Sequence, residues 1–247
     1  MLRHFVTSLT FVCAAGAAQA VDLGDMTPQE RADFGAAVRE YLMENPQVIM
    51  EAVQLLEERQ QAAQADEDKQ LVAQNSDALF ADPGSWVGGN PDGDITLVEF
   101  IDYRCGYCRR AHPEVARLLE DDGNIRLIVK EFPILGEQSV TASRFAIATR
   151  LAHGDDAYRQ VSDALIAFSG DYSPSALTRI ATSLGLDAQP IFARMEDEEV
   201  TEIIRETRAL AQRLKISGTP TFVLEDEMLR GYLPYDQMRA LVDEQRG

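Results

Sequence analysis

Two cysteines separated by two residues, Cys105 and Cys108, are the side chains of this sequence best suited to chemistry. They follow a strand-like apolar run at 95–101 and precede a segment at 109–119 with a helical pattern. The first sulfur would then lie at the N-terminus of a helix, where free backbone N–H groups favour a thiolate. A thiolate can attack a disulfide, and a cysteine one helical turn later can resolve the mixed disulfide. The spacing therefore predicts thiol–disulfide exchange.

Three other interpretations of the cysteine pair remain open. Haem attachment requires a histidine directly after the second cysteine, where this chain has Arg109. A structural zinc site needs four ligands, and Cys105, Cys108 and His112 could supply three of them, with His153 as the fourth. A purely structural disulfide would close a very short loop and would contribute little to stability. Because the chain has no second cysteine pair, redox exchange is favoured and no metal site is expected.

A carboxylate and a proline complete the candidate site. Glu99 stands in the apolar run six residues before Cys105, where burial would raise its pKa and suit it to proton transfer. A solvated carboxylate at the end of a strand is the alternative. Thr219 and Pro220 stand directly before a second apolar run at 221–224. Proline is tolerated at the start of a strand, and the residues alone favour an ordinary trans bond there.

The first twenty residues have the pattern of a secretory signal peptide. Arg3 and His4 form a basic start, residues 5–18 are apolar, and Ala18-Gln19-Ala20 is a small-x-small cleavage site. This segment is too short to span a bilayer, and no other stretch is apolar for long enough. Its removal would leave 247 − 20 = 227 residues and two of the three cysteines, which suits a thiol reagent in an oxidising compartment.

The acidic composition limits the partners of the protein. A formal net charge of −18 argues against nucleic acid and against anionic membrane surfaces as partners. The charge otherwise reports solubility, and it indicates no substrate preference. The length permits one domain together with an extension.

The extension is expected at 21–75 and the catalytic domain at 76–247. Thr27, Pro28 and Glu30 predict a capped helix start, and Asn45-Pro46 predicts the start of a second helix. Apolar residues recur at helical spacing up to Leu56, and a charged stretch at 57–70 then favours an exposed helix or a linker. Such helices need a partner to cover their apolar face, either the catalytic domain or further copies of the chain. Self-association is the favoured alternative.

The catalytic part has the pattern of an α/β fold. Strands are expected at 95–102, 124–132, 221–224 and 228–231, with a closing helix at 236–245. Residues 137–216 are expected to be mostly helical, in segments at 139–152, 157–168, 173–184 and 190–214. Glycine-rich sequence at 88–93 indicates turns. Strands and helices in this order predict an α/β layer architecture.

Three separated motifs, at 100–113, 130–135 and 217–223, resemble the bacterial periplasmic Dsb proteins. These are thiol–disulfide oxidoreductases with a thioredoxin fold and a helical insertion, which would fall at about 137–216. The resemblance implies that Cys105 is the nucleophile, that Cys108 is the resolving thiol, and that Glu99 is a buried acid. It also implies a cis Thr219–Pro220 bond facing the cysteines, with adjoining backbone that binds a client peptide. Gly106 and Tyr107 would tune the redox potential, because the strongly oxidising branch has Pro-His there and the isomerase branch resembles this chain.

The sequence at 38–53 is similar to the N-terminal helices of suppressor-of-copper-sensitivity C proteins, which build a trimeric disulfide isomerase. The two resemblances together imply a periplasmic enzyme that forms a homo-oligomer, a trimer above all. They imply cysteine-containing exported proteins as clients, a membrane thiol–disulfide protein as redox partner, and no cofactor besides the Cys105–Cys108 disulfide. A monomeric dithiol oxidase is the alternative within this class. A Cu(I)-binding protein is the alternative outside it, because a reduced cysteine pair is a soft ligand set.

Overall fold

The computed structural model describes residues 26–247, and the expected signal peptide lies outside these residues. By its contacts the chain forms two compact units, one ending at Arg59 and one formed by Gln60–Gly247. The division falls inside the long helix α2 (Gln47–Gln74). The domain boundary that we expected at 75–76 stays a prediction about independent folding. Within residues 26–247 no helix is both long and apolar enough to cross a membrane.

The first unit contains α1 (Pro28–Glu44) and the first part of α2. The side chains and backbone N–H groups of Thr27 and Glu30 bond reciprocally, which confirms the expected capping box. In the described part of this unit, residues 26–59, no side chain is buried. Its exposed large apolar side chains are Phe34, Val38, Tyr41, Met43, Ile49, Met50, Val53, Leu55 and Leu56.

The second unit is built on one five-stranded mixed sheet with the order β1-β3-β2-β4-β5. Strands β2 and β3 are parallel, and the other neighbours pair antiparallel. The strands are β1 (Trp86–Gly89), β2 (Ile95–Ile101), β3 (Ile125–Glu131), β4 (Thr221–Leu224) and β5 (Glu227–Arg230). The helices after α2 are α3 (Ser76–Phe80), α4 (Gly106–Asp122), α5 (Glu137–His153), α6 (Asp155–Ala167), α7 (Pro174–Ser183), α8 (Ala188–Arg194), α9 (Glu198–Arg213) and α10 (Tyr235–Arg246).

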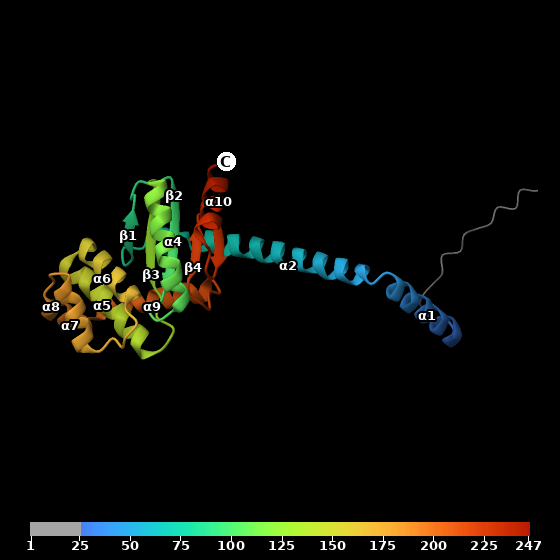
Figure 1. Ribbon diagram of the computed structural model, residues 1–247, viewed down its shortest axis with the longest axis horizontal. Helices are drawn as coiled ribbons and strands as arrows, with labels where there is room; N and C mark the ends of the chain where they lie inside the picture. Colours follow the sequence, from blue (N-terminus) through green and yellow to red (C-terminus); the bar gives the residue numbers. More distant parts are fainter. Residues whose placement is uncertain (1–25) are drawn as a thin grey trace, which may run out of the picture. The chain divides into compact units, whose positions relative to one another are not determined.

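Two helical layers cover the sheet of the second unit. Alternate residues of β2, Ile95, Leu97 and Ile101, face α4, α10 and the helical lobe α5–α8, which Figure 1 shows beside the sheet. The residues between them, Val98 and Phe100, face α9, α3 and the end of α2. The sheet is therefore buried on both sides, and the expected α/β fold with a helical insertion is confirmed.

Two elements differ from the sequence-based expectation. Strand β1 forms where turns were expected, because a four-residue run with two glycines has too little pattern to indicate a strand. Gly88 lies under the ring of Trp86, where a Cβ would collide, and Gly89 has a φ of +64°. The single helix expected at 190–214 is two helices, because α8 ends at Arg194 and a new helix begins after Asp197.

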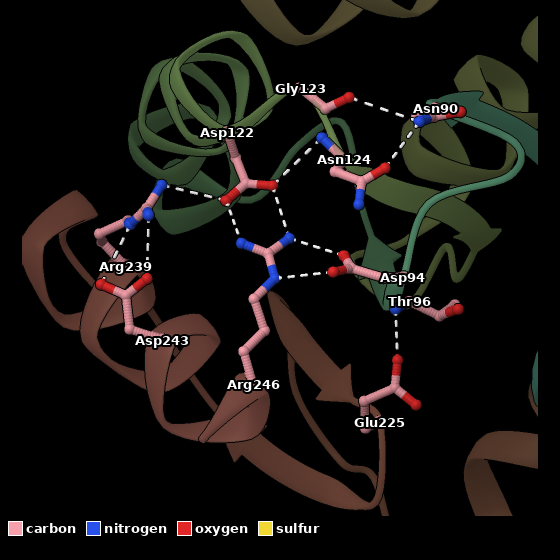
Figure 2. Close-up of polar contacts among 10 residues, drawn as sticks. All are labelled: Asn90, Asp94, Thr96, Asp122, Gly123, Asn124, Glu225, Arg239, Asp243 and Arg246. Atoms are coloured by element: carbon pink, nitrogen blue, oxygen red, sulfur yellow. Dashed lines mark hydrogen bonds and ion pairs between the residues drawn. The ribbon is translucent and has the colours of Figure 1, made fainter.

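The C-terminal helix is fastened to the end of α4 by a buried carboxylate. Figure 2 shows the Arg246 guanidinium between Asp94 and Asp122, with N–O distances of 2.6–3.1 Å. Arg239 of the same helix also contacts Asp122, at 3.0 Å. Since α4 carries the cysteines at its other end, this cluster fixes the helix on which the site is built.

Candidate active site

The two cysteines lie at the start of α4, directly after the turn that leaves β2. Cys105 is the N-cap residue, and its backbone oxygen accepts the hydrogen bond from Arg109 N. Cys108 faces inward on the same stripe as Ala111, Val115 and Leu118. Both thiols are free and buried. The first-turn N–H groups at the helix N-terminus favour negative charge at the position of Cys105.

The loop before β4 brings Thr219 and Pro220 against the cysteines. Cys105 Sγ donates a hydrogen bond to the backbone oxygen of Thr219 at 3.1 Å, and the Thr219–Pro220 bond is cis. Antiparallel pairing of β4 with β2 brings together segments more than a hundred residues apart. Gly106 and Tyr107, between the cysteines, are exposed. A client that reaches Cys105 would therefore meet the Tyr107 ring and the backbone of the 218–220 loop.

Glu99 is a buried carboxylate on the side of the sheet that faces α4. It lies between Val129 of β3 and Phe222 of β4, and only 3% of its surface is exposed. Burial raises its pKa from 4.5 to about 7, and the charge of His112 opposes that rise. Its Oε1 atom has no hydrogen-bond partner within the described residues. A carboxyl that titrates near neutral pH can accept and return a proton under physiological conditions.

Cys108 is a buried thiol that would need a proton acceptor before it could act as a nucleophile. Burial raises the pKa of its thiol far above the ordinary value, and the charge of Glu99 raises it further. A buried thiol that stays protonated is a poor nucleophile. For this sulfur to attack, its proton would have to be removed, and Glu99, whose charge acts on the thiol, has a pKa suited to accepting it.

Asp102 was missed in the sequence although it holds the whole cysteine turn. Its side chain is fully buried, and its two oxygens accept backbone N–H groups of Arg104, Ile134 and Leu135 at 2.8–3.0 Å. It thereby ties the cysteine turn to the loop after β3, whose Ile134 and Leu135 side chains are exposed. A charged residue directly after a buried strand was the available indication.

A second buried acid, Glu131, fixes the turn from the other side. Its Oε1 atom lies 2.7 Å from the Tyr103 hydroxyl and 2.6 Å from the Tyr158 hydroxyl. Burial raises the pKa of Glu131 to about 7. Tyr103 stands two residues before Cys105, so these contacts join the cysteine turn to β3 and α6. The indication in the sequence was a charge at an inward position of the β3 alternation, beside Ile125, Leu127 and Val129.

The two histidines that could have joined a zinc site lie in separate surroundings. His112 Nε2 is 3.2 Å from Asp163 of α6, and His153 Nε2 is 3.0 Å from the backbone oxygen of Asp187. Across residues 26–247 no group of three or more His, Cys, Asp or Glu side chains is arranged to hold a metal ion.

Comparison with known families decides the relationship. Residues 96–243 match the model of the DSBA-like thioredoxin domain. The chain belongs to this family. Residues 30–63 match a second model, the copper resistance protein ScsC N-terminal domain. The chain therefore combines a DSBA-like thioredoxin domain with ScsC-like N-terminal helices, and both resemblances drawn from the sequence are confirmed.

Curated relatives match about two thirds of this chain. A Na(+)/H(+) antiporter NhaA 1 of Salinispora arenicola is 31% identical over 156 residues, which cover 63% of this chain and 24% of that protein. The chain thus spans about a quarter of the length of these antiporter sequences. Disulfide bond formation protein D of Bacillus subtilis is 22% identical over 185 residues, covering 70% of this chain and 83% of that protein.

Solved structures agree with the family. A thioredoxin-like oxidoreductase from Silicibacter pomeroyi is 45% identical with a TM-score of 0.65, covering 69% of this chain and 96% of that chain. ScsC of Proteus mirabilis in a transitional conformation is 27% identical with a TM-score of 0.65, covering 90% and 97%. The latter match therefore includes the N-terminal helices as well as the catalytic unit.

Proposed function

We propose that this protein exchanges disulfides in exported client proteins, with Cys105 as nucleophile, Cys108 as resolving thiol and Glu99 as proton acceptor. The observation that carries the proposal is the placement of Cys105 at the N-terminus of α4, bonded to the Thr219 backbone, with the protonated Cys108 thiol buried near Glu99. No cofactor is required besides the Cys105–Cys108 disulfide that forms during turnover.

The reaction divides into two exchange steps. The Cys105 thiolate attacks one sulfur of a client disulfide, and the other client sulfur leaves as a thiolate. Cys108 then gives its proton to Glu99 and attacks Cys105 Sγ. This attack breaks the mixed disulfide and releases the second client thiolate. The client disulfide is thereby reduced and the Cys105–Cys108 pair is oxidised. The reverse sequence of steps oxidises a client dithiol. In isomerisation, another thiol of the client attacks the client sulfur of the mixed disulfide before Cys108 reacts, which forms a new client disulfide and displaces Cys105 as a thiolate.

The isomerase direction is supported by the first unit. Its large apolar side chains are exposed, and contiguous exposed apolar surface marks an interaction site. Its match to the ScsC N-terminal domain supports self-association, with a trimer as the expected form. Several catalytic units in one assembly can hold one misfolded client between them. A monomeric oxidase is the competing outcome.

The expected signal peptide and the family support a periplasmic location. In that compartment, a thiol–disulfide reductase in the membrane would keep Cys105 and Cys108 reduced. One of the matching structures is described as a periplasmic thioredoxin-like protein from Salmonella enterica serovar Typhimurium. The clients would be exported proteins with at least three cysteines, because two cysteines can pair with each other in only one way.

Cysteine variants test the assignment of nucleophile and resolving thiol. The Cys105→Ser variant should lose all exchange with a disulfide-bonded client. The Cys108→Ser variant should accumulate mixed disulfides, seen as higher-mass bands on non-reducing gels that reductant removes. Exchange that persists in the Cys105→Ser variant would show that Cys105 is not the nucleophile.

A further inference from the structure

A cavity of about 310 Å³ lies beside Glu99, between the sheet and helices α4 and α6. Its inner wall is formed by Glu99 and by buried apolar side chains of β2, β3 and α4, among them Ile101, Val115 and Val129. At its outer end lie Ala116, Arg159 and Asp163, which are exposed. The cavity thus connects a buried carboxylate with the surface between α4 and α6, and its volume is sufficient for several water molecules.

Glu99 is a buried polar group in the wall of this cavity, and one of its hydrogen-bonding atoms is unpaired within residues 26–247. Its Oε1 has no partner among the described residues, although the carboxyl is almost fully buried. The neighbouring acid Glu131 has Oε1 bonded to Tyr103 and Tyr158, and its Oε2 atom also has no partner among the described residues. Unlike Glu99, however, Glu131 does not line this cavity. An unpaired buried carboxylate oxygen at a cavity of this size is expected to bond water there.

His112 and Asp163 form the titratable pair at the outer end. They line the same cavity from α4 and α6, and their ring nitrogen and carboxylate oxygen are 3.2 Å apart. Asp163 raises the pKa of His112, and the charge of Glu99 acts in the same direction. The charged groups around Glu99 are thus His112 on α4 and Glu131 on β3. Arg159 and Asp163 are the charged groups that α6 adds to the cavity.

We propose that this cavity is the proton exit of the active site and that His112, oriented by Asp163, is its outer proton acceptor. The proposal rests on the proposed function and assigns it a route. As Cys108 attacks the mixed disulfide, its thiol proton passes to the Glu99 carboxylate. Glu99 then gives a proton to cavity water, and that water gives one to the neutral imidazole of His112. The imidazolium returns it to solvent, which leaves Glu99 ionised for the next turnover.

The experiment measures release of a client peptide from its mixed disulfide with Cys105 in the full-length protein. Rapid mixing separates this step from the first attack, which is followed independently as alkylation of Cys105. The His112→Ala variant should slow release about tenfold, a modest share of what proton transfer contributes to enzymes. It should leave alkylation unchanged, and added imidazole should restore release in part. A merely structural role would show no such rescue.

Two further variants test the route and the specificity. Ala116→Leu narrows the cavity from its exposed end, and it should slow release without rescue by imidazole. Asp121→Asn alters another ion pair of α4, with Arg117, that lies away from the cavity, and it should release the peptide at the wild-type rate. Wild-type release rates in His112→Ala, or slow release that imidazole does not restore, would overturn the proposal. The proposed function would still hold in that case if Cys108→Ser traps the mixed disulfide.

Discussion

Glu99 couples the stability of the fold to pH, because its carboxyl is buried in the native state and solvated in the unfolded chain. Its native pKa of about 7 lies above the ordinary 4.5. Below pH 4.5 both states hold the proton, so burial of the neutral acid adds no electrostatic cost. Between pH 4.5 and 7 the native state binds more protons than the unfolded state, so stability falls as pH rises. Above pH 7 the full cost of the buried charge, about 3 kcal/mol, is present.

The Glu99→Gln variant removes this titration. We expect its free energy of unfolding, relative to wild type, to increase by about 3 kcal/mol between pH 4.5 and pH 8. Urea unfolding of the two reduced proteins across this range measures the difference, and Glu131, present in both, is largely removed by the subtraction. A difference that does not change with pH would mean that Glu99 is ionised at little cost in the native state.

Side chains whose role follows from type and spacing could be identified from the sequence. Cys105 and Cys108 were predicted from their separation, and Glu99 from a charge inside an apolar strand. Asp102 and Glu131 were missed, because their roles depend on partners that are distant along the chain. The N–H groups of Ile134 and Leu135 reach Asp102 only through the pairing of β2 with β3, and Tyr158 reaches Glu131 only through the packing of α6.

At the scale of elements, the end of α2 is attached to the catalytic unit by ion pairs. The buried Asp68 carboxylate is bonded by both terminal nitrogens of Arg230 on β5. Glu67 and Lys69 pair with Lys215 and Asp226 on either side. The charged composition of 57–70 predicted an exposed helix or a linker, and the structure has a helix there. Burial of Asp68 and Val72 was not expected, because a carboxylate enters a core only with a partner that the sequence does not reveal.

Removal of the Arg230 guanidinium should destabilise the C-terminal end of α2. The Arg230→Gln variant leaves the Asp68 carboxylate buried without its cation, and we expect a loss of about 2 kcal/mol. This is less than for a fully buried pair, because 37% of the Arg230 side chain is exposed. Hydrogen exchange should accelerate in residues 60–74, while Lys69→Gln, which breaks an exposed pair, should leave exchange nearly unchanged. Equal effects of the two substitutions would show that burial of Asp68 is unimportant.

At the scale of the whole molecule, the two units differ in whether their apolar side chains are buried or exposed. The catalytic unit buries its apolar side chains in two clusters, one on each face of its sheet. The described part of the first unit exposes its own along one face of α1, at Phe34, Val38 and Tyr41. A helix of this kind gains little from intrinsic propensity and depends on a covered apolar face. If copies of the chain cover it, activity on misfolded clients depends on residues far in sequence from the cysteines.

Serine substitution of Phe34, Val38 and Tyr41 tests this dependence in the full-length protein. Since these side chains are exposed, the catalytic unit should keep its stability and its oxidation of simple dithiols. The molar mass by light scattering should fall from an oligomer to a single chain, and reactivation of a scrambled-disulfide protein should be lost with it. A control with serine at Arg39, Glu40 and Glu44 should keep both. Oligomers that persist would show that another surface holds the copies together, and single chains that still reactivate the scrambled protein would separate isomerisation from assembly.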